Sequence, residues 1–373
     1  MRRRDPEPDE VRFHLVERCP ECGRHLQEGW EHARRQVIEV ICQPWVTEHV
    51  VMRSWCGVCR KQWIPKLEPG ALGVQGKRRF GASVQALAAL LHIQCRVPIR
   101  AVQEFFREVG EISISTGEIV ALLEGVRAAG EPALAEIKAR VRQAKWASGD
   151  ETGWREDGEN GYLWGFFTER ERYFEYRKSR AGRVPEEILG KDFGGIVSCD
   201  FYGGYNKFDR LQRCWVHLLR DAKTLAERNA DRPEVLAWVE ALKTLYREAK
   251  DFSARSPRRR RRARAACEQR AEALARPYGQ DPEAPQRVLS QGILKHLGEL
   301  FVFVEHPEVP SDNNLAERSL RPAVIARKVS GGTRSPKGSQ TWTGLRSLFS
   351  TWRARGQPLL RSCRELLLPT PVP

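Results

Sequence analysis

The sequence lacks an apolar run long enough to span a membrane. Its longest apolar stretch, VQALAALLHI, covers about half of the roughly 20 residues that a spanning helix needs. The opening residues, MRRRDPEPDE, carry charge but not the apolar segment of a secretory signal. A nucleophile elbow and a Ser/His/Asp grouping are also missing, so hydrolysis by a serine or tyrosine nucleophile finds no support. We expect a cytoplasmic protein without a membrane partner.

What is present is a folded, basic chain. Its 373 residues are 41% hydrophobic and include 11 Trp, enough for two or three domains with real cores. Lys and Arg number 63 against 48 Asp and Glu, which leaves a formal charge of +15 and favours a polyanionic partner such as nucleic acid. The 10 cysteines fit a cytoplasmic protein only if they are reduced or bound to metal.

Four cysteines form two CxxC pairs near the start of the chain, CPEC and CGVC. They are Cys19, Cys22, Cys56 and Cys59. A two-residue spacing lets two thiolates share one tetrahedral zinc, so the pairs predict a closed, structural Zn²⁺ site in a module over residues 1–70. The intervening stretch, residues 36–55, is expected to form a strand hairpin that returns the second pair to the first. Cys42 and His25 are alternative ligands, and four unligated thiols are the alternative to any metal site.

Helical spacing begins after a Gly-rich linker. Residues 83–95 carry apolar side chains at helical spacing, Pro98 can open a second helix, and Ser115 with Glu118 forms a capping box ahead of a third. Short helices separated by turns predict a helix-turn-helix-like DNA-binding domain over residues 77–144, although most such triplets serve only in packing.

Near residue 146 the spacing of apolar side chains changes from helical to alternating. KWASGDETGW, GYLWGFFT and RYFEYRK predict an antiparallel meander, PEEILG a short helix, and GGIVSCDFYGGY a strand that ends at Asp200. This order predicts a mixed α/β sheet. Adjacent strand residues point to opposite faces, so Asp150 and Glu151 cannot both serve one site, and we assign Asp150 to it.

Residues 211–300 are expected to be mostly helical. They include the run RSPRRRRRARAAC, typical of a solvated or disordered loop, which would neutralise phosphates if it were ordered against DNA. In SDNNLAERSLRP, Ser311 or Asp312 can cap a helix that carries Glu317. GGTRSPKGS is expected to form a flexible basic loop and TWTGLRSLFSTWRA a closing amphipathic helix.

The three acids predict metal chemistry. Asp150 and Asp200 on strands and Glu317 on a late helix could hold two hard divalent cations, Mg²⁺ or Mn²⁺, against a phosphodiester. Asp312 is the alternative to Glu317, because five residues turn a helix by about 140° and both cannot face one metal pair.

Five stretches carry a family resemblance. In chain order DETGW, GYLWGFF, SCDFYGGY, CWVHLLRDAK and SDNNLAERSLRPAVIARK resemble the insertion sequence 66 family of bacterial transposases, over roughly residues 145–355. The N-terminal CxxC pairs resemble that family's zinc module. Relatives usually carry a longer helical leader than this chain does, a departure that bears on multimerisation and recognition of the element's ends.

The resemblance implies a ribonuclease H-like core with a DDE triad, and it assigns the triad to Asp150, Asp200 and Glu317. It divides the core into residues 145–228 and 301–360, with a helical insertion at residues 229–300. Cys214 and His217 match a Cys-x-x-His found after the second acid in several transposases. We expect His217 either to touch the scissile phosphate or to serve in packing.

The implied reaction is cleavage at the element's ends followed by transfer of the 3′-hydroxyl into target DNA, without a covalent protein–DNA intermediate. Four basic residues and one amide would contact DNA: Arg318, Arg321, Arg327, Lys328 and Asn313. Expected partners are DNA, a second copy of the chain and small accessory proteins of the element, in the bacterial cytoplasm at the nucleoid. Two alternatives stay open: an inactive, zinc-containing DNA-binding protein derived from a transposase, and a ribonuclease acting on RNA–DNA hybrids.

Overall fold

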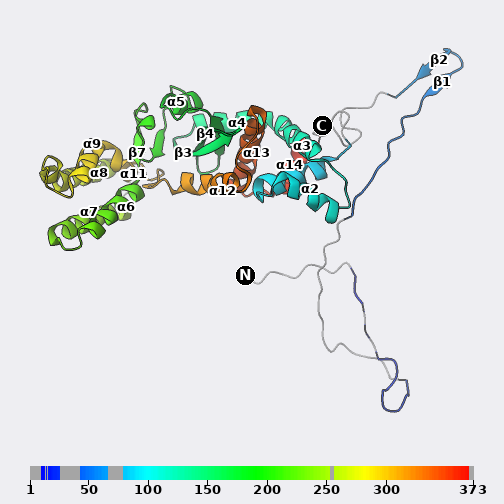
Figure 1. Ribbon diagram of the computed structural model, residues 1–373, viewed down its shortest axis with the longest axis horizontal. Helices are drawn as coiled ribbons and strands as arrows, with labels where there is room; N and C mark the ends of the chain where they lie inside the picture. Colours follow the sequence, from blue (N-terminus) through cyan, green and yellow to red (C-terminus); the bar gives the residue numbers. More distant parts are fainter. Residues whose placement is uncertain are drawn as a thin grey trace.

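The computed structural model describes residues 10–12, 14, 16–25, 43–65, 79–252 and 256–368. Figure 1 shows an elongated body with a sheet in its middle, helices α7 to α9 at one end and helices α2, α3 and α14 at the other. In the described part of the chain, no helix is long and apolar enough to cross a membrane.

The central sheet has five strands in the order β5-β4-β3-β6-β7. Their bounds are β3 (Trp146–Glu156), β4 (Glu159–Phe167), β5 (Arg172–Arg177), β6 (Ile196–Cys199) and β7 (Leu211–Arg213). Strands β3, β4 and β5 form the predicted antiparallel meander, whereas β6 and β7 run parallel to β3. Helix α5 (Arg183–Leu189) connects the two parts. The predicted mixed α/β sheet is confirmed, while β7 was not predicted because three residues are too few to show alternation.

The N-terminal helices are α1 (Ala82–Ala89), continued by a π-helical turn (Leu90–Gln94), α2 (Ile99–Glu108), α3 (Thr116–Ala129) and α4 (Glu131–Arg142). The predicted capping box is present: Ser115 Oγ accepts from Glu118 N at 3.1 Å, and Ser115 N donates to the Glu118 carboxylate at 3.0 Å. Buried side chains of α1 to α4 form one core with those of strands β3, β4 and β5 and of helices α12 (Asn314–Ser330), α13 (Pro336–Ala354) and α14 (Leu359–Leu367). The helix-turn-helix and the boundary near residue 144 stay predictions.

Helix α13 (Pro336–Ala354) is buried along most of its length, from Ser339 to Trp352. The closing helix predicted over residues 341–354 is present, but it is buried on nearly all sides and therefore not amphipathic. Its hydroxyl groups bond the outer edge of β5: Ser347 Oγ accepts from Phe174 N at 2.9 Å, and Thr351 Oγ1 accepts from Arg172 N at 3.0 Å. Because these bonds satisfy the free amides of an edge strand, the serines and threonines of α13 lie inside the protein rather than on its surface.

The predicted flexible loop GGTRSPKGS is also ordered. Gly331 and Gly332 have φ values of 72° and 103°, in the left-handed region that glycine tolerates. Thr333 N then donates to Arg155 O at 2.9 Å, and α13 begins at Pro336, three residues before the predicted loop ends. This segment therefore joins the far end of β3 to the buried helix.

In the described residues between β7 and the helix that carries Glu317, the chain forms six helices. They are α6 (Trp215–Arg228), α7 (Pro233–Asp251), α8 (Pro257–Gly279), α9 (Arg287–Lys295), α10 (Leu297–Leu300) and α11 (Val302–Glu305). The predicted helical character is confirmed. The arginine run is not a loop, because it forms the first turns of α8, where Arg261 and Arg264 both pair with Glu305.

The bonds between α13 and β5 generate a prediction. We expect Thr351→Val to lower the free energy of unfolding by about 1–3 kcal/mol, because Arg172 N would lose a buried acceptor while the shape is kept. Urea unfolding measures the change. Thr224→Val is the control, since the Thr224 hydroxyl bonds only the Arg220 carbonyl of its own helix. Equal losses in both variants would contradict this account of α13.

Candidate active site

The three predicted acids come from three elements that meet at one end of the sheet. Asp150 lies in β3, Asp200 directly follows β6, and Glu317 is in the first turn of α12 (Asn314–Ser330). Strands β3 and β6 pair in parallel with Ser148 opposite Ser198. Asp150 and Asp200 each lie two residues after this pair. Because parallel strands keep their register, the two aspartates are side by side where the pairing of β3 and β6 ends.

A hydrogen bond from a side chain to the backbone ties the start of α12 to this place. The buried Asn313 donates from Nδ2 to Gly149 O at 2.9 Å, next to Asp150. Asp312 Oδ1 accepts from Asn314 N at 3.0 Å in the turn before the helix. The N-cap residue of α12 is Asn313, whose side chain makes no capping bond, so the predicted cap by Ser311 or Asp312 is wrong. Residues 311–314 thus place Glu317 beside the strand that carries the first acid.

The electrostatics of Asp150 show how close the acids lie. Burial raises the pKa of Asp150 to about 7, and the negative charges of Glu151, Asp200 and Glu317 act in the same direction. The hydrogen bond from Glu151 N opposes this shift. Asp150 therefore shares a partly buried space with the other two acids, where like charges disfavour ionisation.

Three carboxylates fit Mg²⁺ or Mn²⁺ in kind, because both ions prefer oxygen ligands. A cation among them would also offset the burial and the repulsion that together raise the pKa of Asp150. Within the described residues, however, no three His, Cys, Asp or Glu side chains are close enough together to hold a metal ion. Coordination would require the side chains to rotate toward one another.

Glu151 has a different environment from Asp150. Its carboxylate accepts from Arg180 at 2.7 Å and from the buried Tyr205 hydroxyl at 2.9 Å. Burial raises the pKa of Glu151, although both bonds act against the shift. A carboxylate with two strong donors is held in place, which supports the assignment of Asp150 rather than Glu151 to the site.

The CWVH motif lies against the SDNN motif. Cys214 Sγ accepts from Asn313 N at 3.2 Å, and Trp215 N donates to Ser311 O at 3.0 Å. His217 Nε2 is 3.7 Å from Glu317 Oε1. Cys214 is thus a buried structural thiol, while His217 is the member of the motif that reaches the predicted triad.

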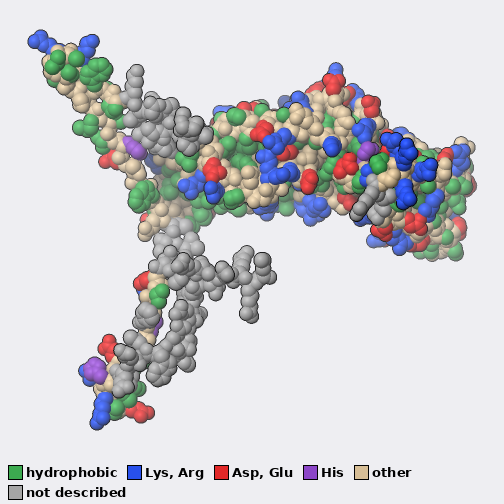
Figure 2. Space-filling model, turned by 180° about the vertical axis from the view of Figure 1, so that it is seen from behind, with side chains coloured by type: hydrophobic (Ala, Val, Ile, Leu, Met, Phe, Trp, Pro, Cys, Tyr) green, Lys and Arg blue, Asp and Glu red, His purple; other side chains and the backbone are tan. Residues whose placement is uncertain are grey.

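Asn313 has another position than predicted. Its side chain is 1% exposed and connects α12 to β3, so it does not face DNA here. Arg318, Arg321 and Lys328 are exposed along α12, and the partly buried Arg327 donates from Nη1 to Gly153 O. Figure 2 shows Lys and Arg side chains spread over the body, with a dense group on the helical insertion.

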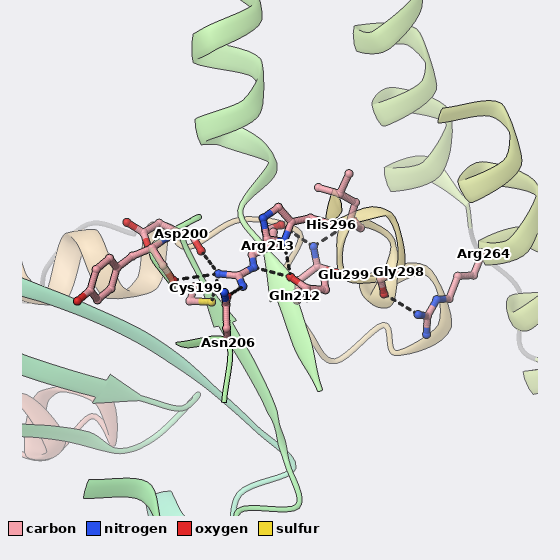
Figure 3. Close-up of polar contacts among 11 residues, drawn as sticks. Cys199, Asp200, Asn206, Gln212, Arg213, Arg264, His296, Gly298 and Glu299 are labelled. Atoms are coloured by element: carbon pink, nitrogen blue, oxygen red, sulfur yellow. Dashed lines mark hydrogen bonds and ion pairs between the residues drawn. The ribbon is translucent and has the colours of Figure 1, made fainter. Parts of the chain in front are cut away.

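Arg213, which the sequence reasoning missed, holds the loop that follows β6. Its side chain is fully buried (Figure 3) and donates to Asp200 O at 2.8 Å and to Asn206 Oδ1 at 2.6 Å. On its other side it pairs with Glu299 of α10 at 2.6 Å. Arg213 therefore fixes the backbone of the second acid and links it to the helical insertion. An arginine at the end of a three-residue strand gives no sequence signal for this role.

Each CxxC pair lies in a small turn of its own. The backbones of Arg18 and His25 form an isolated antiparallel β-bridge on either side of the first pair. The antiparallel strands β1 (Ser54–Cys56) and β2 (Lys61–Trp63) enclose the second pair. Backbone hydrogen bonds, chiefly from Cys22 and Cys59 respectively, lower the pKa values of Cys19 and Cys56, which favours the thiolates that bind metals.

The two turns lie apart in Figure 1, so four-cysteine coordination is not shown in the described residues. Of the strand hairpin predicted over residues 36–55, residues 43–53 form no strand, and residues 36–42, with Cys42, lie outside the described part. The Zn²⁺ site stays a prediction.

A mixed sheet that gathers two aspartates and a glutamate from β3, β6 and a late helix is consistent with the core of a DDE transposase. The family model described as Transposase IS66 family matches residues 77–341, more than half of the sequence. The chain therefore belongs to the IS66 family of transposases, and the resemblance noted in its motifs is confirmed. No curated protein matches it.

The pKa of Asp150 predicts a pH-dependent stability. The carboxyl titrates near 3.8 when unfolded and at about 7 when folded, so the folded state binds the proton more tightly between these values. The free energy of unfolding should fall as pH rises through this window. Asp150→Asn removes the effect, so its stability advantage over wild type should grow from pH 5 to pH 8, to at most about 4 kcal/mol.

Urea unfolding in a metal chelator at both pH values measures this difference. The exposed Asp231→Asn is the matched control. An advantage that stays constant between pH 5 and pH 8 would show that Asp150 does not titrate in this range.

A second prediction concerns Arg213. Arg213→Lys keeps the charge but cannot reach Asp200 O, Asn206 and Glu299 together, so it should cost about 2–4 kcal/mol of unfolding free energy. Arg270→Lys is the control, because the Arg270 pair with Glu248 is half exposed. Similar small losses in both variants would argue against a central role for the Arg213 network.

Proposed function

We propose that this chain catalyses both cleavage at the ends of its element and transfer of the resulting 3′-hydroxyl into target DNA. The observation that carries the proposal is that β3, the end of β6 and α12 bring Asp150, Asp200 and Glu317 into one region of the structure. There burial raises the pKa of Asp150, and the charges of Glu151, Asp200 and Glu317 add to the rise. The core would be ribonuclease H-like.

Asp150, Asp200 and Glu317 would hold Mg²⁺ or Mn²⁺. Two such ions supply an activated oxygen nucleophile and stabilise the leaving oxygen when they are bound. His217, 3.7 Å from Glu317, would orient that carboxylate or approach the scissile phosphate. Arg213 would keep Asp200 in position.

DNA would lie along α12, where the exposed Arg318, Arg321 and Lys328 can contact phosphates. Cys19, Cys22, Cys56 and Cys59 would bind a structural Zn²⁺ after the two turns come together. Because two element ends must meet, a homo-oligomer on DNA is expected in the cytoplasm, with accessory proteins of the element as further partners.

Strand transfer with purified protein, Mn²⁺ and a pre-cleaved DNA end from the repeats flanking the gene tests the proposal. Asp200→Ala and Glu317→Ala should each lower joined product at least about 100-fold. Their matched controls are Asp231→Ala and Glu365→Ala, two exposed acids outside the site. DNA binding by wild type without product under any divalent ion would instead favour an inactive, transposase-derived DNA-binding protein.

A further inference from the structure

A pocket of about 520 Å³ lies at the opposite end of β3 and α12 from the three acids. One wall is the β3–β4 hairpin and the other is the last turn of α12. Its lining residues are Gly153, Trp154, Arg155, Asn160, Gly161, Tyr162, Arg327, Lys328 and Gly331.

The pocket is positively charged. Arg155, Arg327 and Lys328 face it, and no acid in the described part of the chain pairs with any of the three. Arg155 bonds the Asn160 side chain at 3.4 Å, and Arg327 bonds Gly153 O. A concave site with three unneutralised cations, a side-chain amide and a tyrosine suits a phosphate that is part of a larger organic group.

The walls of the pocket are fixed. A Cβ on Gly153 would lie 2.8 Å from Arg327 Nη1, so glycine here lets the arginine cross β3. Gly331, with a φ of 72°, ends α12. Thr333 then bridges back to the hairpin, accepting at its carbonyl from Asp157 N at 2.8 Å. The cations are therefore held on two elements that are bonded to each other.

Both elements lead from this pocket to the proposed catalytic acids. From Asp150 to residues 153–155 of β3 is about 10–17 Å at roughly 3.3 Å per residue. From Glu317 to residues 327–328 of α12 is about 15–17 Å at roughly 1.5 Å per residue. Along one DNA strand, with a rise of about 3.4 Å per nucleotide, these lengths correspond to about three to five nucleotides.

We propose that this pocket binds one backbone phosphate of the DNA strand about three to five nucleotides from the scissile phosphate. The inference rests on the proposed function and names a second contact point for the same substrate. Arg155 and Lys328 supply the mobile charges and Arg327 the fixed one, so the pocket sets where along the strand cleavage occurs.

A phosphate-neutralisation scan tests it. A series of DNA ends carries one uncharged methylphosphonate at each position from one to eight nucleotides from the cleavage point. Wild-type binding should weaken about 3- to 10-fold when the neutral linkage falls in the three-to-five window. In Arg155→Ala/Lys328→Ala, the same linkages should cause no further loss. The slope of log K against log salt should become shallower by about 0.9, because one phosphate contact is lost.

The control is Lys243→Ala/Arg247→Ala, which removes two exposed cations that both pair with Glu240 on α7. It should keep the wild-type profile across the scan. The pocket does not hold this phosphate if the Arg155→Ala/Lys328→Ala variant still loses binding at positions three to five as wild type does. The same conclusion follows if wild type loses binding only at other positions.

Strand transfer in the same samples separates the two proposals. If joined product forms but no position from three to five weakens binding, the catalytic proposal stands and the pocket proposal is refuted. If binding weakens at positions three to five only when Arg155 and Lys328 are present, and no joined product forms, the pocket is supported as a DNA site on a protein that does not catalyse strand transfer.

Discussion

Carboxylates of like charge stay near one another only if their backbones are tied together by other bonds. In this chain the ties are hydrogen bonds to the backbone. The uncharged Asn313 side chain donates to Gly149 O, Asn313 N donates to Cys214 Sγ, and Arg213 holds Asp200 O. They join β3, the start of α6 and the start of α12 at one point. Since these hydrogen bonds are buried, removing one partner would leave a buried donor or acceptor without a hydrogen bond. The cost of crowding acids together is thus offset by groups that take no part in the chemistry.

Much of the fold could be predicted because its local signals agree with its packing. Alternation gave the meander, the β-branched run gave β6, and Ser115 with Glu118 gave the start of α3. One failure comes from polar residues that face inward. Ser347 and Thr351 made α13 read as amphipathic, although their hydroxyls bond β5. The spacing of polar and apolar residues shows only which side chains are polar. Whether a polar side chain is buried depends on whether a backbone group distant in the sequence needs it as a hydrogen-bond partner.

The candidate site divides in the same way. The three acids could be picked out because strand alternation excluded Glu151 and because the motifs resemble a known family. Arg213 could not be found, since its importance lies in contacts to Asp200, Asn206 and Glu299 that lie far apart in the sequence. Asn313 was recognised as notable but for another role. In the structure Asn313 is buried and connects α12 to β3.

The helical insertion leaves and re-enters the core at almost the same place, because Trp215 N bonds Ser311 O at 3.0 Å. The whole stretch between them therefore closes a loop whose ends do not move when its length changes. Loop-closure entropy grows only slowly with length. Evolution could lengthen, shorten or replace these helices without altering the spacing of the acids, provided that a partner for Arg213 is kept. Glu299 and His217 of α6 are then the fixed requirements in a stretch whose other helices can be exchanged.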